Sequence, residues 1–240
     1  MADFISKSLL KEKAALYGVG LDEKALERFD IYARLLVEWN DKINLTAITE
    51  PDEIVIKHFV DSLSIFSAVD IPEGSRVIDV GTGAGFPGVA MLIARPDLDI
   101  TLMDSTNKKL NVIRDILENI GLEANVVHKR AEEAGQSKDF RESYDFATAR
   151  AVSNLRDLSE FCLPFVKVGG TFISMKSAKA DEEIEEGKKA ISVLGGRIRE
   201  KKTFNLEDAG ERTVILIEKS SSTPAKYPRP SAKMAKYPIR

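Results

Sequence analysis

The sequence predicts an α/β fold of the doubly wound type, in which a mostly parallel, seven-stranded sheet carries helices on both faces. From residue 73 onward, short apolar runs alternate with segments of helical periodicity, which is the pattern of parallel strands joined by crossover helices. The first 72 residues show helical periodicity alone, and the last two predicted strands follow each other directly. We therefore expect a helical N-terminal extension over 1–72, a core over 73–219 and a basic C-terminal tail over 220–240.

The N-terminal extension is predicted to be helical because its apolar residues recur at a spacing of three or four. Between residues 21 and 40, Phe29, Tyr32 and Leu36 fall on one face of such a helix. Asp22 precedes this run and is a favourable N-cap residue. We expect one long helix here that packs by its apolar face.

The predicted core alternates strands with helices in a regular order, after a turn at residues 72–75. Strands are predicted at 76–80, 99–103, 125–128, 144–148, 170–175, 197–203 and 212–218. Helices are predicted at 87–95, at 107–120, around Leu155, Leu158 and Cys162, and at 181–192. The last two strands are expected to form a closing hairpin.

The composition indicates a protein with a buried core in a reducing compartment. Hydrophobic residues make up 43% and charged residues 30% of the 240 positions, a balance typical of soluble globular domains. No apolar run approaches the roughly 20 residues that a membrane helix needs, and the first residues lack a secretion-signal pattern. Cys162 is the single cysteine, which excludes an intrachain disulfide and a cysteine-based zinc site. We expect a cytoplasmic monomer without a metal and without membrane contact.

Charge is distributed unevenly along the chain. The net charge is −3, but residues 220–240 contain five basic residues and no acidic one, so the remainder carries −8. A basic tail on an acidic body indicates a local contact with an anion such as a nucleic-acid backbone. The alternative is a solvated, disordered end.

The strongest functional signal is a glycine-rich loop after the first predicted strand. Residues 77–88 read VIDVGTGAGFPG, with four glycines in eight residues. Glycine is required where a ligand lies against the backbone or where φ is positive. In a doubly wound sheet, ligands bind beyond the carboxyl ends of the strands. We therefore expect Gly81, Gly83 and Gly85 to contact a cofactor, with a tight structural turn as the alternative.

Two residues of this loop favour S-adenosylmethionine over a dinucleotide. Asp79 places a carboxylate at the strand end, where it would repel a pyrophosphate and attract the cationic aminopropyl group of S-adenosylmethionine. Pro87 removes a backbone donor that phosphate sites use at a helix start. We expect Asp79 to bind this cofactor and its product, S-adenosylhomocysteine. A nicotinamide oxidoreductase is the disfavoured alternative.

Two more strand ends carry candidate cofactor contacts. Asp104 ends the second predicted strand and can accept hydrogen bonds from both ribose hydroxyls. The third strand leads into Arg130-Ala131-Glu132-Glu133, where a backbone amide and Glu132 could contact the adenine edge. The alternative for this stretch is a solvated charged surface.

The methylated atom is narrowed down by what the chain lacks. Methylation of a pyrimidine carbon needs a thiolate nucleophile, and Cys162 falls on the apolar face of a predicted helix. The Asn/Asp-Pro-Pro-aromatic motif of exocyclic-amine methyltransferases is replaced by Thr-Ala-Arg-Ala-Val at 148–152, so Arg150 occupies the catalytic corner. Arginine is not a general base, and this suits guanine N7, whose lone pair needs no deprotonation. Arg150 would then act by positioning, or it is a structural ion pair.

These motifs together resemble the RsmG (GidB) family, the bacterial 16S rRNA guanine-N7 methyltransferases, over nearly the whole chain. The markers are Trp39-Asn40, Ile43-Asn44-Leu45-Thr46, His58-x-x-Asp61-Ser62-Leu63, the loop at 79–88, Arg130-Ala131-Glu132-Glu133, Ala149-Arg150-Ala151, Met175-Lys176 and Lys226-Tyr227-Pro228-Arg229. The resemblance implies a Rossmann-like class I methyltransferase core with a helical extension. It also implies the 30S ribosomal subunit as substrate, with guanine 527 as the expected target.

Site residues follow from the same resemblance. It implies cofactor contacts at Gly81, Phe86, Ala131, Glu132 and Arg150, and contacts near the RNA at His58, Asp61, Lys176, Lys226 and Arg229. The chain departs from the family pattern at residues 230–233, Pro-Ser-Ala-Lys, where a Lys-Pro-Gly continuation is usual. The competing functions are methylation of another RNA, a protein or a small molecule, and RNA binding without catalysis.

Overall fold

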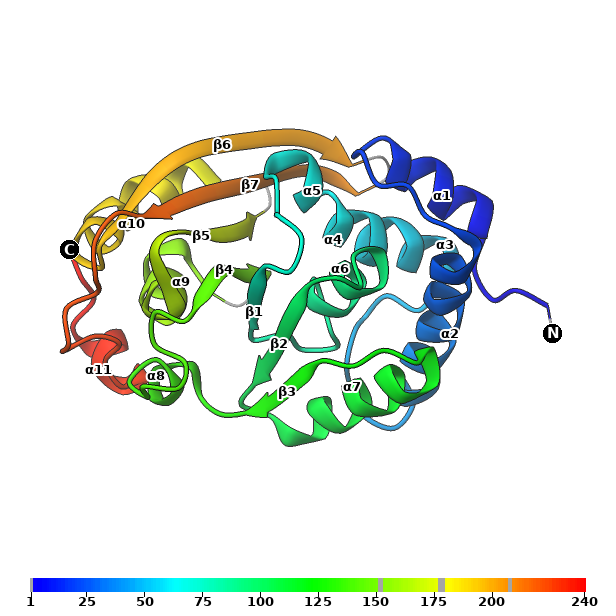
Figure 1. The fold of residues 1–240 in the computed structure, drawn as a ribbon, viewed down its shortest axis with the longest axis horizontal. Helices are drawn as coiled ribbons and strands as arrows, with labels where there is room; N and C mark the ends of the chain where they lie inside the picture. The colour runs from blue at the N-terminus through cyan, green and yellow to red at the C-terminus, as the bar shows by residue number, and fades with distance from the viewer. Residues whose placement is uncertain (1, 151–152, 177–179, 207–208) are drawn as a thin grey trace.

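A twisted seven-stranded sheet runs through the centre of the molecule in the order β3-β2-β1-β4-β5-β7-β6 (Figure 1). The computed structural model describes residues 2–150, 153–176, 180–206 and 209–240, so the family marker Ala151 lies outside the described residues. The first five strands pair in parallel, and β7 is antiparallel to both neighbours. The strands are β1 Arg76–Val80, β2 Asp99–Asp104, β3 Asn125–His128, β4 Tyr144–Arg150, β5 Val166–Lys176, β6 Gly196–Leu206 and β7 Gly210–Lys219.

All seven predicted strands are present, but several are longer than their apolar runs. Strand β4 continues through Arg150, because the backbone of Arg150 pairs with Met175 of β5 although its side chain is charged. The hairpin of β6 and β7 likewise extends beyond its apolar centre on both sides. Backbone hydrogen bonds hold these polar ends in the sheet, so hydrophobicity alone underestimates the length of the strands. The extension of β4 matters for function because it fixes the backbone of Arg150.

Helices cover both faces of the sheet. They are α1 Lys7–Ala15, α2 Glu23–Asn40, α3 Pro51–Ile54, the π-helix η1 Val55–Val60, α4 Asp61–Leu63, α5 Ile65–Ala68, α6 Gly88–Ala94, α7 Asn107–Ile120, α8 Ala131–Ala134, α9 Leu155–Cys162, the short 3₁₀ helix η2 Leu163–Phe165, α10 Ala180–Val193 and α11 Ser231–Lys236. One apolar cluster joins α1 to α7 with one face of the sheet, and a second joins α9 and α10 with the other. The predicted helix at 87–95 began at Pro87, whereas in the structure Pro87 is the N-cap and α6 begins at Gly88.

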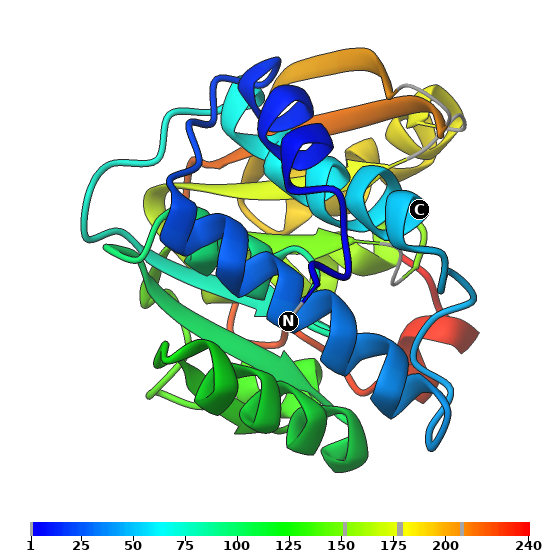
Figure 2. The same ribbon diagram turned by 90° about the vertical axis from the view of Figure 1, so that its right-hand side faces the viewer.

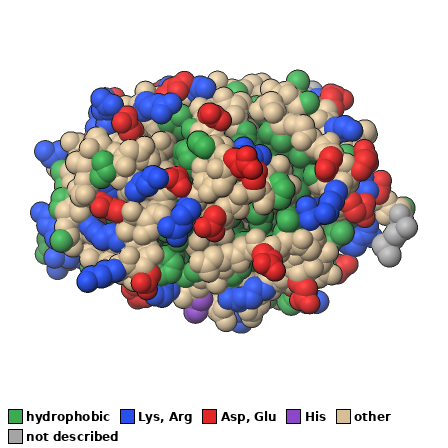
Figure 3. All heavy atoms as spheres, viewed as in Figure 1, with side chains coloured by type: hydrophobic (Ala, Val, Ile, Leu, Met, Phe, Trp, Pro, Cys, Tyr) green, Lys and Arg blue, Asp and Glu red, His purple; other side chains and the backbone are tan. Residues whose placement is uncertain are grey.

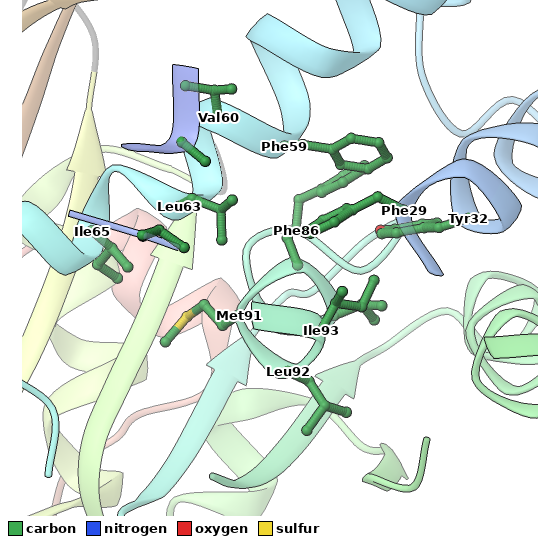
Figure 4. Packing of buried hydrophobic residues seen from close by; sticks show 14 of the residues in the cluster. Phe29, Tyr32, Phe59, Val60, Leu63, Ile65, Phe86, Met91, Leu92 and Ile93 are labelled. Carbon is green, nitrogen blue, oxygen red and sulfur yellow. The ribbon is translucent and has the colours of Figure 1, made fainter. Parts of the chain in front are cut away.

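The N-terminal helices pack directly against the glycine-rich loop. Figure 2 shows α1 and α2 lying in front of the sheet, and Figure 4 shows Phe29, Tyr32 and Phe59 gathered around Phe86. Tyr32 is fully buried, and its hydroxyl donates to the carbonyl oxygen of Ala84 at 2.7 Å. The N-terminal helices therefore support the loop from one side.

The C-terminal tail folds back onto the core beside α8 and α9 (Figure 1). Tyr227 and Pro228 are buried, and Met234 of α11 is 3% exposed. The alternative of a solvated, disordered end therefore does not describe this segment. Across the part of the chain that the structure describes, each helix is too short or too polar to cross a membrane.

Candidate active site

The glycine-rich loop turns sharply between the end of β1 and the start of α6. Gly81, Gly83 and Gly85 have φ of 72°, 61° and 103°, a region that residues with a Cβ adopt at a cost. The amides of Gly81 and Thr82 donate to the carbonyl oxygen of Met103 at 2.9 and 3.0 Å. These bonds fix the loop to the end of β2. Residues 81–83 form a ledge at the carboxyl end of the sheet.

This ledge forms the floor of a cavity of about 520 Å³. Its walls come from the ends of β1 and β2, from the segment leading into α8, and from a loop of the N-terminal extension. Among the lining residues are Leu45, Thr46, His58, Gly81, Gly83, Phe86, Asp104, Ala131, Glu132, Arg150 and Ser231. Six of the predicted cofactor contacts other than Arg150 are therefore brought together in one place: Gly81, Gly83, Phe86, Asp104, Ala131 and Glu132.

Asp104 is held in a fixed orientation at the cavity wall. Its Oδ2 accepts the amide of Gly83 at 3.0 Å, and its Oδ1 accepts the amide of Thr106 at 2.8 Å. Each carboxylate oxygen keeps a further acceptor position, and the residue is 7% exposed. A pair of oriented acceptors at the end of β2 fits two neighbouring ribose hydroxyls.

Asp79 does not occupy the position that the sequence prediction gave it. Its side chain is fully buried and is absent from the cavity lining. Its Oδ2 accepts the amide of Gly88 at 3.0 Å, and its Oδ1 accepts the hydroxyl of Thr148 at 3.1 Å. Asp79 therefore links β1, β4 and the start of α6, and we correct the expected contact with the cofactor's cationic end. Its bond with Gly88 also occupies a donor that a pyrophosphate would need.

Burial makes Asp79 a source of pH-dependent stability. Burial raises the pKa of the Asp79 carboxyl from 3.8 to about 6, although hydrogen bonds from Gly88 and Thr148 oppose this rise. The folded carboxyl then binds a proton more tightly than the unfolded one, so the free energy of unfolding should fall as pH rises from about 4 to about 6. Asp79→Asn removes this titration, and the wild type should lose up to about 3 kcal/mol relative to the variant across that window.

Urea unfolding of both proteins between pH 4 and pH 7.5 measures this difference. Asp70→Asn, at an exposed carboxylate, is the control and should leave the pH profile unchanged. Parallel profiles for the wild type and Asp79→Asn would contradict the assignment.

Gly85 also acts differently from its prediction. It does not line the cavity. A Cβ on Gly85 would lie 2.7 Å from the hydroxyl oxygen of Tyr32 and 2.7 Å from a methyl carbon of Val89. Gly85 is therefore required by its positive φ and by the close approach of α2. Gly81 and Gly83 are the predicted glycines that line the cavity.

A second cavity, of about 460 Å³, adjoins the first. His58 and Arg150 line both cavities. The other lining residues include Lys57, Asp61, Ser153, Met175, Lys176, Glu183, Phe204 and Arg212. Three of the predicted RNA contacts, His58, Asp61 and Lys176, thus line one cavity next to the first cavity.

Arg150 is one of two arginines that pair with Asp61 at the boundary of the two cavities. Its Nη1 donates to Asp61 Oδ2 at 2.8 Å, and the Nε of Arg212 donates to Asp61 Oδ1 at 3.0 Å. The guanidinium carbon lies 4.8 Å from the ring centre of Phe86, in cation–π range. Asp61 is 5% exposed and has both oxygens engaged by arginines, which makes it a counter-ion and a poor general base.

His58 orients Arg150 as a neutral ring. Burial, and secondarily the charge of Arg150, lower the pKa of His58 to about 3. Its Nδ1 lies 3.3 Å from Arg150 Nη2, a donor, so the proton resides on Nε2, 2.8 Å from the hydroxyl of Thr46. The ring stacks on Phe86 with centres 4.5 Å apart. The π-helix η1 presents His58 to the site, and such helices occur often at functional sites.

Sequence comparison finds relatives along nearly the whole chain. The sequence model of the family described as GidB, rRNA small subunit methyltransferase G, matches residues 25–214. A protein of Lachnoclostridium phytofermentans named Ribosomal RNA small subunit methyltransferase G is 47% identical over 224 residues, covering 92% of this chain and 93% of that protein. A protein of the same name from Alkaliphilus metalliredigens is 45% identical over 237 residues, covering 98% of this chain and 99% of that protein.

This chain belongs to the rRNA small subunit methyltransferase G family. The family resemblance drawn from the motifs is thereby confirmed. Among solved structures, TrmN from Thermus thermophilus matches 67% of this chain and 48% of that chain, with a TM-score of 0.53 and 18% identity. A chain of a fibrillarin/Nop5p complex is covered to 80%, with a TM-score of 0.52 and 12% identity. At these identities the likeness shows the fold alone, and it confirms the predicted class I methyltransferase architecture.

Two of the basic residues that the methyltransferase G resemblance placed near RNA have their charges already engaged. Lys176 is paired with Glu183 at 2.8 Å and also contacts the carbonyl oxygen of Ser153. Arg229 donates from Nε to Glu160 Oε1 at 2.8 Å and from Nη2 to Oε2 at 2.6 Å, and its side chain is only 13% exposed. Arg229 is therefore a structural anchor, which corrects its expected contact with RNA. Lys226 is exposed and remains available.

Three residues of this methyltransferase G site were not predicted from the sequence: Thr46 as the partner of His58, Arg212 as the second partner of Asp61, and Ser231 in the lining of the first cavity. Thr46 lies within a marker motif, which is a usable signal. Arg212 and Ser231 reach the site from the far C-terminal part of the chain, and their neighbours in the sequence give no signal.

Proposed function

We propose that this methyltransferase transfers the methyl group of S-adenosylmethionine to N7 of a guanine in the 16S rRNA of the small ribosomal subunit. One observation carries the proposal: two cavities of ligand size meet at Arg150 and His58. The first is suited to the cofactor and the second to a nucleobase. Family membership supplies the substrate class, since the relatives are named for small-subunit ribosomal RNA.

The first cavity has the chemistry that S-adenosylmethionine requires. Asp104 presents two oriented acceptors for the ribose, and Gly81 and Gly83 form a ledge without side chains. Phe86 supplies an apolar wall next to the loop, and Ala131 and Glu132 line the region beyond β3. The N-terminal end of α6 is closed to phosphate by Asp79. The cofactor, when bound here, supplies an electrophilic methyl group on a sulfonium.

The second cavity supports methylation of N7 by orientation of the base. Arg150 offers its guanidinium at the boundary, where it would bind O6 of guanine and leave the neighbouring N7 free to face the methyl donor. N7 carries an in-plane lone pair and needs no base, which agrees with a neutral His58 and a doubly paired Asp61. Holding the two reactants in line can contribute roughly 7–11 kcal/mol to the barrier reduction.

The finer assignments rest on the family pattern and are part of the same proposal. Guanine 527 in the assembled 30S particle is the expected target, and the cytoplasm is the expected compartment. The face in Figure 3 carries interspersed acidic and basic side chains. On this face, recognition of the assembled particle would rely on shape and on local contacts more than on one large basic surface. Lys226, which is exposed, is a candidate for such a contact.

Methyl transfer to undermethylated 30S particles tests the proposal. With labelled S-adenosylmethionine, we expect label in 16S rRNA, recovered as 7-methylguanosine after nuclease digestion. After borohydride reduction and aniline cleavage of the methylated rRNA, primer extension should stop at guanine 527. Naked 16S rRNA and the 50S particle are the controls and should accept little label. Label on a ribosomal protein, or on a base other than guanine, would contradict the assignment.

A further inference from the structure

The C-terminal segment runs from the end of β7 along one side of the molecule to the first cavity, where the proposed function places the cofactor. Residues 227–234, which we call the C-terminal strap, run past α8 and α9 and enter helix α11 (Figure 1). Ser231, the first residue of α11, lines the cofactor cavity. The segment that composition identified as an RNA-binding tail therefore forms part of a different site.

The strap is fixed to the core at several points. Arg229 forms the paired contact with Glu160 of α9, which is 2% exposed. The side-chain amide of Gln136 donates to the carbonyl oxygen of Pro228 at 2.9 Å, and Arg141 donates to that of Tyr227 at 2.8 Å. A Cβ on Gly135 would lie 2.8 Å from the ring of Pro228, so the strap passes over α8 at close range.

At the cavity, the strap contacts a predicted cofactor residue. The Ser231 hydroxyl donates a hydrogen bond to Oε1 of Glu132. The Glu132 side chain is 12% exposed, and its other neighbour is the guanidinium of Arg130 at 3.8 Å from Oε1. Both contacts engage Oε1. A carboxylate that is oriented through one oxygen presents the second to a ligand.

We propose that Ser231 is a positioning residue of the cofactor site, which orients Glu132 so that Oε2 accepts a hydrogen bond from the 6-amino group of adenine. This inference rests on the proposed function, because it takes the cavity to bind an adenosine cofactor. It assigns the C-terminal strap to recognition of adenine. A hydrogen bond to a charged acceptor contributes enough to make the loss of orientation measurable.

Two ligands separate adenine recognition from general binding. S-adenosylhomocysteine carries the 6-amino group, and S-inosylhomocysteine has a carbonyl oxygen there, which cannot donate to Glu132. Calorimetric titration of the wild type should give clear discrimination in favour of the adenine ligand. Ser231→Ala should weaken S-adenosylhomocysteine binding about fivefold to tenfold and leave S-inosylhomocysteine nearly unchanged, so that the ratio of the two dissociation constants narrows.

Three variants control the result. Ser231→Thr keeps the hydroxyl and should restore the ratio. Lys233→Ala, at an exposed position of the same helix, should leave both affinities unchanged. In a Glu132→Ala background, Ser231→Ala should have no further effect, because its action runs through Glu132.

The outcomes distinguish the inference from the function on which it rests. If the wild type binds neither ligand, both the proposed function and the role of Ser231 are wrong. If the wild type binds both and Ser231→Ala leaves the ratio unaltered, only the role of Ser231 is overturned. A ratio that narrows equally in Lys233→Ala would overturn it as well, since the effect would then belong to the helix as a whole.

Discussion

Arg150→Lys should lower kcat/KM for methyl transfer to 30S particles about 100-fold, because a small misplacement of the reacting groups has effects of that size. The contacts of the guanidinium include those with Asp61, with Nδ1 of His58 and with the ring of Phe86. Lysine keeps the positive charge beside Asp61, but one ammonium on a flexible stem does not reproduce the planar fork. The target base would then lose its fixed orientation towards the methyl donor.

The retained charge makes this variant a test of geometry. An alanine would leave Asp61 partly unpaired and would confuse activity with stability, whereas lysine should leave the thermal midpoint within a few degrees of the wild type. Arg156→Lys is the matched control, since Arg156 pairs with the adjacent Asp157 away from both cavities. Steady-state assays on 30S particles and titration with S-adenosylhomocysteine give the two readouts. Near-normal turnover in Arg150→Lys would exclude its positioning role.

Much of the fold follows from patterns that are local in the sequence. Apolar runs of strand length, glycines at positive φ and an acid at the end of β2 each report on a residue's immediate surroundings. The positions of Gly81, Gly83 and Asp104 at the cavity could therefore be predicted together with the positions of the strands along the chain. The ends of β4 and β5 could not, because backbone pairing extends strands through charged residues such as Arg150 and Lys176.

The errors in the site concern charged residues whose partners are distant in the sequence. Asp79 lies at the predicted strand end, but its carboxylate turns to Thr148 on the neighbouring strand and away from the cavity. The sequence gives the charge of such a residue but not the direction of its side chain, which depends on whichever buried donor comes close. Glu132 does line the cavity as predicted, but its contact with Ser231 depends on the path of the C-terminal strap, which the sequence around Glu132 does not indicate.

Replacing Arg229 by methionine tests the corrected role of the basic tail and should destabilise the protein by about 3 kcal/mol, the usual effect of breaking a buried ion pair. Glu160 is 2% exposed, and both of its oxygens are bound by Arg229, which also donates its backbone amide. Methionine has a similar volume but leaves the carboxylate buried without its cation. Denaturant unfolding at neutral pH measures the change.

A second substitution separates the lost pair from lost packing. Arg229→Met combined with Glu160→Gln should recover most of the stability, because a neutral amide costs less to bury than an unpaired carboxylate. Lys226→Met, at an exposed basic position of the same segment, should change the free energy of unfolding by less than about 0.5 kcal/mol.

Lys226→Met should instead reduce the salt dependence of 30S binding, since each phosphate contact that is lost lowers the slope. If Arg229→Met were as stable as the wild type and reduced that slope, the charge of Arg229 would serve RNA and its pairing with Glu160 would be dispensable. We expect Arg229 to stabilise the fold and Lys226 to contact RNA. A guanidinium that already donates from two nitrogens to a carboxylate has few donors left for a phosphate.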